Sequence, residues 1–470
     1  MPIQTTSNTE VTSIALHPHY ATFLDYFTEM RDTFAGEAVI KSKGETYLPM
    51  TSGQMKDNQN GAAAYEAYKT RAVFYDYVSD TVTDMLGLLH KETTQFRLPT
   101  ALEQLLLKST PDGETISMLL RRIHEEQLIP GRIGLLLDVP SDAAGVHVVP
   151  QVVTYNAETI VNWDIGSSVP RWYVLDESGY QMKGNLDWEM KVKYRLIALD
   201  GMGKYYTRTF DKWPGDIDID NPDEEAVYPT VRGKMSNEIP FQIINAASVL
   251  PGFEFPPLLS IANLSLATYR GESDYRQALF MQAQSTLFLK GFGDDELNGM
   301  RVGAGAAIKT TNTEATAEFI EVSGAGLFEM RLSQENLMKE TANLGVEMVD
   351  KNGVESGDAI ITRLTVRTAS MSSVAKSAAA GLTKILQIAA RWVGANDSEV
   401  IIIPATDFSD SLATSKNVLE MWSVVQQGGM ALEDYHSWLS ERDYTSDTFE
   451  DWKSKLEAAL PSTTLTNVQI

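Results

Sequence analysis

The amino-acid sequence predicts an α+β fold. Two long helical stretches, Pro256–Ala283 and Phe328–Asp350, flank a short insert with the composition of strands and turns. Far from them, residues 147–213 are rich in β-branched and aromatic side chains and are broken by Gly–Asp turns, which is typical of antiparallel strands. Strands and long helices thus occupy separate parts of the chain, as in the α+β class.

Length, charge and cysteine content limit the classes of function. The 470 residues are enough for about two to four domains with a large core. A net charge of -24 repels DNA phosphates and anionic lipid headgroups, so a tight grip on nucleic acid or on a membrane surface is disfavoured. The absence of cysteine excludes disulfides, thiolate metal sites and cysteine nucleophiles. With no apolar run long enough to span a membrane and no signal peptide, we expect a soluble protein of a reducing cytoplasm or of an assembly formed there.

The first half of the chain contains helices followed by strands. His17–Gly36 predicts a short helix, and Tyr65–Glu92 predicts one long helix because apolar side chains recur there at steps of three and four. Residues 102–140 predict two further helices and then a strand at Gly134–Val139. After the antiparallel strands, Pro214–Pro229 is an acidic stretch that we expect to form a loop.

The first long helix poses a packing question. It opens with Pro257, which a helix tolerates because its first-turn N–H groups have no partner. Its first half places leucine, isoleucine and alanine side chains nearly all the way round, whereas an ordinary surface helix has one apolar stripe. Its second half is polar enough to exclude a membrane span. Such a helix needs neighbours on every side.

The last third of the chain returns to helices. Val366–Val393 predicts a third long helix, rich in alanine and serine, whose backbone can approach its neighbours closely. The stretch "EVIIIPATDF" is typical of a buried strand. The tail predicts three amphipathic helices, near Ser415–Gln427, Leu432–Arg442 and Phe449–Leu460.

No catalytic, metal or cofactor site is recognisable. Asp216, Asp218 and Asp220 begin like a calcium loop, but Asn221 stands where the turn needs glycine and Val227 where a glutamate should close the cage. We therefore expect a solvated acidic loop. The histidines lack partners at ligand spacing, and no phosphate loop, dinucleotide fingerprint or nucleophile elbow is present. The sequence thus predicts no cofactor and no enzymatic activity.

Several phrases, taken in order, resemble the portal proteins of tailed bacteriophages. "YLPMTSGQ", "YEAYKTRAVFYDYVSDTVTDMLGLLHKE" and "GRIGLLLDVP" look like the wing of that family, and "TYNAETIVNWDI" resembles its strand–turn–strand element. "EIPFQIINA" and "LLSIANLSLATYRGESDYRQALF" are similar to its first stem helix with the segment that leads into it. "EVSGAGLFEMRLSQENLMKETANLGVEMV" resembles the return stem helix. Each phrase alone is weak, and their shared order from Tyr47 to Gly394 carries the resemblance.

The resemblance implies a portal-protein fold with an antiparallel β wing, long stem helices, a small β-containing clip and a helical crown. The implied division is: N-terminal arm and wing 1–255, stem helix 256–283, clip 284–327, return stem helix 328–351, tunnel loop 352–365, wing helix and strand 366–413, and crown 414–470.

It also implies a role. Portal proteins form a ring, usually a dodecamer, at one vertex of the capsid, through which DNA is packaged and ejected. Implied partners are further copies of the chain, the large terminase subunit, a head–tail adaptor, the major capsid protein, a scaffold, and double-stranded DNA that passes non-specifically, with no membrane. The protein would be located in the virion after assembly in the host cytoplasm. In a ring, neighbouring subunits could cover the first stem helix all round.

Three groups of candidate residues follow. We expect Leu264 and Leu266 to lie between subunits of the stem. The acidic clip residues Asp294, Asp295 and Glu296 are candidates for docking, because binding residues often lie on loops held by a rigid support. The tunnel loop has glycines at 353 and 357 that favour mobility. Its candidates to face DNA are Lys351, Asn352, Glu355, Asp358 and Arg363.

The third long helix has basic side chains on one side. Lys376, Lys384 and Arg391 lie within about 80° of one another on a helical wheel. They could meet DNA or, as the surplus of carboxylates favours, acidic groups of an adjacent subunit. Two other classes of function stay open from the sequence: a cytoplasmic enzyme with no recognisable site, and an acidic monomeric scaffold or adaptor.

Overall fold

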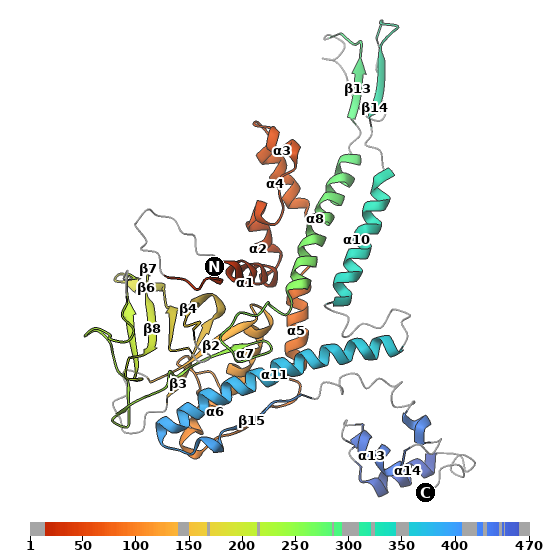
Figure 1. Ribbon diagram of the computed structural model, residues 1–470. Helices are drawn as coiled ribbons and strands as arrows, with labels where there is room; N and C mark the ends of the chain where they lie inside the picture. The colour runs from red at the N-terminus through yellow and green to blue at the C-terminus, as the bar shows by residue number, and fades with distance from the viewer. Residues whose placement is uncertain are drawn as a thin grey trace.

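The computed structural model describes residues 15–139, 150–166, 170–213, 217–283, 286–293, 310–320, 325–344, 357–406, 421–425, 430–440, 444–445 and 447–459. It is 47% helical and 19% strand. The helices and strands are largely segregated, as Figure 1 shows, and the predicted α+β class is confirmed.

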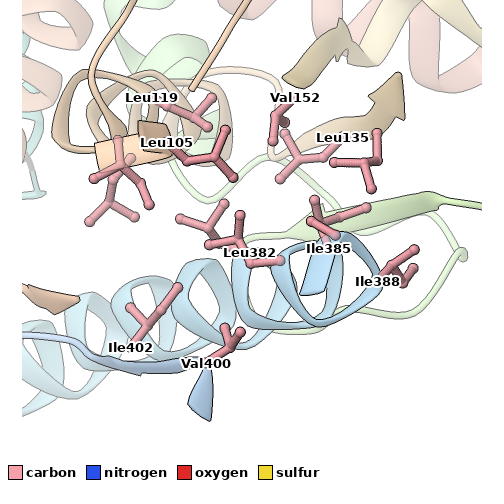
Figure 2. Close-up of a cluster of buried hydrophobic side chains, with 14 of the residues drawn as sticks. Leu105, Leu119, Leu135, Val152, Leu382, Ile385, Ile388, Val400 and Ile402 are labelled. Atoms are coloured by element: carbon pink, nitrogen blue, oxygen red, sulfur yellow. The ribbon is translucent and has the colours of Figure 1, made fainter. Parts of the chain in front are cut away.

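The body is built around a three-stranded antiparallel sheet in the order β12–β2–β3. Its strands are β12 (Phe241–Asn245), β2 (Arg132–Asp138) and β3 (Gln151–Asn156). Helices α7 (Ile116–Leu128) and α11 (Gly357–Val393) pack against this sheet. Figure 2 shows side chains of α11 directed toward Leu135 and Val152 of the sheet and toward Leu105 and Leu119. These fully buried aliphatic side chains form the largest hydrophobic cluster of the described residues.

A second antiparallel sheet has the order β4–β5–β8–β9. It consists of β4 (Ile160–Trp163), β5 (Trp172–Asp176), β8 (Tyr194–Leu199) and β9 (Tyr205–Phe210). Alternate side chains along β8 enter two different clusters, as the period of two in a strand requires: Ile197 joins the side chains of the first sheet, and Leu196 joins a cluster on the far face. The predicted antiparallel strands are therefore present. Between β5 and β8, a hairpin of β6 (Gly179–Lys183) and β7 (Asp187–Lys191) projects from the sheet (Figure 1).

The N-terminal helices differ from the prediction at one point. Helices α1 (Tyr20–Ala35), α2 (Glu37–Ser42) and α3 (Ser52–Lys56) come first. The single helix predicted for residues 65–92 is instead two, α4 (Gly61–Arg71) and α5 (Tyr77–Leu89). The chain turns extended at Ala72, with ψ 145°. The break places Phe74 edge-on against Tyr269, with ring centroids 5.8 Å apart, so tertiary packing overrides the local periodicity.

The two predicted long helices are present as α8 (Leu259–Gln282) and α10 (Ala325–Leu344). They lie side by side and project from the body, and beyond their far end a two-stranded hairpin pairs β13 (Thr286–Lys290) with β14 (Thr316–Ile320) (Figure 1). The first half of α8 is covered by α1, α4 and α5 of the same chain. The all-round apolar character of this helix is thus met largely by its own chain, which corrects the expectation that neighbouring subunits surround it.

Helix α11 begins earlier than predicted. Its backbone is helical from Gly357, so the loop predicted for 352–365 ends before that residue and the prediction of a loop over 357–365 is wrong. No residue from 358 to 365 breaks a helix, and a glycine is well tolerated at a helix boundary. Asp358 and Arg363 therefore belong to a helix. Lys351, Asn352 and Glu355 lie outside the described residues.

The remaining elements are short. They are β1 (Gln95–Arg97), α6 (Gln104–Leu107), β10 (Thr230–Val231), β11 (Lys234–Met235), β15 (Ile401–Ile403), α13 (Leu432–Ser440) and α14 (Phe449–Ala459), with 3-10 helices at Gly44–Thr46, Thr100–Leu102, Ala157–Thr159 and Asp397–Glu399. The prediction of a buried strand at β15 is wrong, because only Ile402 is buried while its neighbours face solvent. In the tail, α13 and α14 match two of the three predicted helices, and residues 421–425 are helical within the third.

Candidate functional site

The N-terminal half of α8 packs against helices α1, α4 and α5. Leu266 is only 2% exposed and packs in one cluster with Tyr68, Phe74 and Tyr269. A side chain that its own chain already covers has no surface left for a neighbour, so the prediction that Leu266 lies between subunits is wrong. Leu264 is half-buried and keeps some free surface.

Polar contacts lock the same region. The hydroxyl of Tyr68 donates to Asp274 Oδ1 at 2.6 Å, and Arg270 Nε donates to the carbonyl oxygen of Tyr47 at 3.0 Å. Burial and the hydrogen bond to the Asp274 carboxylate raise the pKa of the Tyr68 phenol. Tyr68 therefore stays a neutral donor and links α4 to α8.

Gly271 of α8 lies against a side chain of α10. A Cβ atom added to Gly271 would lie 1.9 Å from Nε2 of Gln334 on α10. The glycine that weakens α8 locally thus leaves the space that the Gln334 side chain occupies. Among the described side chains of α10, that of Thr341 is fully buried.

The far end of the helix pair exposes apolar side chains. Leu279, Phe280 and Met281 end α8, while Phe328 and Leu332 lie in the first turns of α10, at the same end of the antiparallel pair (Figure 1). We call these five residues the distal apolar surface. Phe328 is 58% exposed, although Arg331 lies over its ring, and Met281 is 48% exposed. The sequence does not reveal these residues. The apolar pattern that stands out in α8 covers its first half, whereas its exposed apolar residues lie at its C-terminal end.

The hairpin beyond this surface adds two exposed rings. Phe288 and Phe319 are 42% and 58% exposed and point to opposite faces, since Phe319 pairs with Leu287 and Phe288 with Glu318. The predicted docking residues Asp294, Asp295 and Glu296 lie outside the described residues.

The basic side of α11 is partly neutralised within the chain. Arg391 donates to Glu238 at 2.7 Å and to Asp397 at 2.9 Å, so its predicted pairing with an adjacent subunit is replaced by an intramolecular one. Lys376 and Lys384 are exposed on the same side of the helix. Within the described residues, neither lysine forms a salt bridge.

Two histidines that looked isolated in the sequence meet in the fold. Nδ1 of His124 lies 3.0 Å from Nε2 of His90, and burial together with His90 lowers the pKa of His124 to about 3. The two are 34 positions apart on α7 and at the end of α5, so no spacing signal could reveal them. Across the described residues, no group of three or more possible metal ligands comes together.

The core also contains a buried arginine that no sequence motif marks. Arg132 is 1% exposed, and its guanidinium carbon lies 4.7 Å from the ring centroid of Trp163 and 4.8 Å from that of Phe253, two rings that also contact each other edge-on. Its Nη2 donates to the carbonyl oxygen of Pro251 at 3.0 Å, and burial lowers its pKa to about 9. This cation holds the first sheet to the second through ring contacts.

The described part of the acidic stretch, residues 217–229, exposes its carboxylates to solvent, as predicted. Asp218 accepts hydrogen bonds from the backbone N–H groups of Asp220 and Asn221, and Asp220 pairs with Arg171. Both carboxylates are exposed. Over the part of the chain that is described, no helix has the length and apolar character needed to cross a membrane.

A family model named "Domain of unknown function (DUF4055)" matches residues 257–393. Its limits coincide with the start of α8 and the end of α11, so the match covers the helix pair, its hairpin and the long helix. No curated protein matches the chain.

Solved structures of phage-like particles are similar to this chain. A chain of the virion of the native gene transfer agent particle has 12% identity and a TM-score of 0.42, covering 77% of this chain and 89% of its own length. A chain from the neck of the empty particle, computed with C6 symmetry, has 14% identity and a TM-score of 0.38, covering 80% and 90%. A chain from the neck of the native particle, computed with C12 symmetry, has 11% identity and a TM-score of 0.38, covering 77% and 89%. These matches are to chains of virion and neck structures.

Proposed function

We propose that this chain is one subunit of a ring-shaped channel at the capsid vertex of a phage-like particle, the role that portal proteins fill. One observation carries the proposal: a helix pair projects from a well-packed body and ends in the distal apolar surface. Monomeric proteins rarely leave several large apolar side chains exposed together. A neighbouring copy that packs against this end of the helix pair would remove them from water.

The distribution of this surface over two helices fits a ring. In a ring, each subunit presents one flank to the neighbour on one side and a different flank to the neighbour on the other. The apolar side chains of the distal surface come from both α8 and α10, so each helix can serve one flank. The ordered resemblance of the sequence to portal proteins supports a ring of twelve copies.

The charge of the chain suits a passage for DNA. A channel lined by basic groups would bind phosphates and release counterions, which would hold the duplex in place. The net charge of -24 per chain instead favours weak repulsion, so DNA passes without sequence-specific contacts. Lys351, Asn352 and Glu355, which precede α11, are the residues that we propose to meet the DNA backbone.

The end of the molecule that carries the β13–β14 hairpin would bind other particle proteins. We propose that the acidic residues Asp294, Asp295 and Glu296 dock the large terminase subunit during packaging and a head–tail adaptor afterwards. Replacing all three by serine should leave rings intact and weaken both complexes. The wing would contact the major capsid protein and scaffold, and assembly would take place in the host cytoplasm before the protein enters the virion.

The ring itself is tested by light scattering after size exclusion, combined with negative-stain images. The wild-type chain should give annular particles of uniform mass well above the 52.0 kDa of one chain. Leu332→Asp puts a carboxylate in the distal apolar surface and should abolish these particles, because an unpaired charge in a desolvated interface costs several kcal/mol. Lys339→Asp, an exposed position on the same helix, is the matched control and should keep them. Monomers of the wild-type chain at every concentration would refute the ring.

A further inference from the structure

The outer face of α5 carries a row of carboxylates without a cation. Its members, each four residues from the next, are Asp76, Asp80 and Asp84, which we call the aspartate row. Asp80 lies about 160° from the buried Val78 and Val82 on a helical wheel, so the row points away from the core. Among the described residues, none of the three carboxylates forms a salt bridge, and α5 itself has no lysine or arginine.

The carboxylates of this row destabilise one another. Like charges four residues apart on a helix repel. Burial and the neighbouring charge of Asp80 raise the pKa of both Asp76 and Asp84, which shows that their charged forms lack compensation. A cation beside the row would relieve this repulsion.

The outer face of α11 carries the complementary charges. Lys376, Ala380 and Lys384 are exposed at the same step of four residues, and we call them the lysine row. Lys376 lies about 160° from the buried Val374 on a helical wheel, so this row also points away from the core. From the start of the row to its C-terminal end, the helix has no acidic residue. Neither lysine forms a salt bridge within the described chain, whereas Arg391 at the end of the helix is paired.

The two rows match in length. Each spans eight residues, which is about 12 Å along a helix at 1.5 Å per residue. Helices that pack through rows of every fourth residue cross at about 50°, the commonest arrangement in globular proteins, and their rows then run parallel. The two lysines can reach the ends of the aspartate row in this arrangement. The small side chain of Ala380 between them leaves space for the helices to approach at Asp80.

The two rows lie on opposite sides of one chain. Helices α5 and α11 pack against each other in one cluster, which includes Val82 of α5 and Val374 of α11. Each row lies on the side of its helix that faces away from this cluster. The aspartate row therefore cannot meet the lysine row of its own chain, and only a row on another molecule can reach it.

We propose that the lysine row of each copy of this chain binds the aspartate row of a neighbouring copy. The inference rests on the proposed ring and identifies one of its contacts. The contact uses a different flank of each copy, as a closed ring of identical subunits requires. Paired charges of this kind fix the register between subunits and speed their association.

The contact is tested by exchanging its charges and measuring ring dissociation by light scattering. Lys376→Glu with Lys384→Glu should raise the concentration at which rings dissociate at least about tenfold, because like charges then face each other. Asp80→Lys with Asp84→Lys should have the same effect. A chain with all four substitutions should return to within about threefold of the wild type, because opposite charges face each other again.

A matched control separates the contact from the net charge of the chain. Lys212→Glu with Lys234→Glu changes the net charge equally at two exposed positions. This pair should shift the dissociation concentration by less than about threefold, because isolated surface charges contribute little.

The absence of native cysteine permits a direct test of proximity. A chain with both Asp80→Cys and Ala380→Cys has one thiol at the centre of each row. In rings, a short bismaleimide should convert it into a ladder of covalent multimers, whereas either single cysteine should give at most dimers.

Rings of the lysine variant that dissociate at the wild-type concentration would overturn the contact and leave the ring standing. So would a fourfold variant that recovers nothing, or a cysteine pair that gives no ladder in intact rings. A wild-type chain that never forms rings would overturn both the contact and the proposed function.

Discussion

Side chains are buried in the cluster around α11 and exposed at the distal end of the α8–α10 pair. In the cluster, Leu382, Ile385 and Leu135 are fully buried and interdigitate between helix and sheet (Figure 2). At the far end of the helix pair, Phe328 and Met281 are about half exposed, and β13 and β14 bond only to each other among the described residues. The body thus carries its own stabilisation, whereas the projecting end is the part that the proposed ring would stabilise.

This contrast separates folding from assembly. Changes in the body should alter the free energy of unfolding of a single chain, because apolar area there is removed from water during folding. Changes at the projecting end should leave the single chain almost unaltered and act on association. Four substitutions test this contrast, from the largest expected change in the unfolding free energy to the smallest.

The largest effect is expected in the cluster of Figure 2. Leu382→Ala removes a fully buried side chain from the face of α11 on the sheet and should lower the unfolding free energy by about 2–5 kcal/mol. Lys384→Ala, two residues away on the exposed side, should change it by less than about 0.5 kcal/mol. Urea unfolding followed by circular dichroism measures both. Equal effects of the two variants would mean that α11 is not seated as described.

A smaller loss is expected where α11 meets β12. A Cβ atom on Gly381 would lie 2.3 Å from Cγ1 of the fully buried Ile244, so Gly381→Ala should cost about 1–3 kcal/mol by overpacking. Gly87→Ala is the matched control, since nothing lies within 4 Å of a Cβ there. In an exposed helix, alanine is favoured over glycine by up to about 1 kcal/mol. The two glycine variants should therefore shift the urea midpoint in opposite directions.

The buried histidine makes the body sensitive to mild acid. The folded pKa of His124, about 3, lies below its ordinary 6.5, so between these values the unfolded chain binds the extra proton and stability falls as the pH falls. We expect a loss of roughly 1–2 kcal/mol between pH 6.5 and pH 5. His124→Gln should reduce this loss. Unfolding curves at pH 7 and pH 5 measure the difference.

The smallest effect on a single chain is expected at the projecting end. Phe328→Ser changes a side chain that is already 58% exposed and should alter the unfolding free energy of the dissociated chain by less than about 0.5 kcal/mol. The same substitution should markedly lower the fraction of assembled particles in light scattering. A large loss of single-chain stability would show that Phe328 belongs to the core of its own chain and would remove the contrast between the two regions.

Periodicity predicted the elements better than it predicted their surroundings. The helices α8 and α10 and the antiparallel strands follow from residue patterns that belong to each segment alone. The break at Ala72 does not, because it depends on where Phe74 meets Tyr269, a residue nearly 200 positions away. The same holds for Leu266, whose cover comes from α4 and its neighbours rather than from another subunit.

The site was predicted less well than the fold for a related reason. Charged loop residues such as Asp294 and Lys351 stand out in a sequence because they break its patterns, and they fall outside the described residues. The distal apolar surface and the β6–β7 hairpin look in the sequence like ordinary core material. Only the fold shows that Phe328 and Trp188 have no partner in their own described chain that buries them.

The length of α11 gives the molecule a rigid strut. Its 37 residues extend about 55 Å at 1.5 Å per residue, from the foot of the projecting helix pair to the opposite edge of the body (Figure 1). From Met371 onward, one side of this helix is buried, first against side chains of α5 and α8 and then, from Ala378, against the sheet. A helix that is buried along one side and contains no proline tilts as a whole rather than bending. A force applied near Gly357 would therefore reach the body along the whole buried side of the helix, from Met371 to Trp392, rather than at one point.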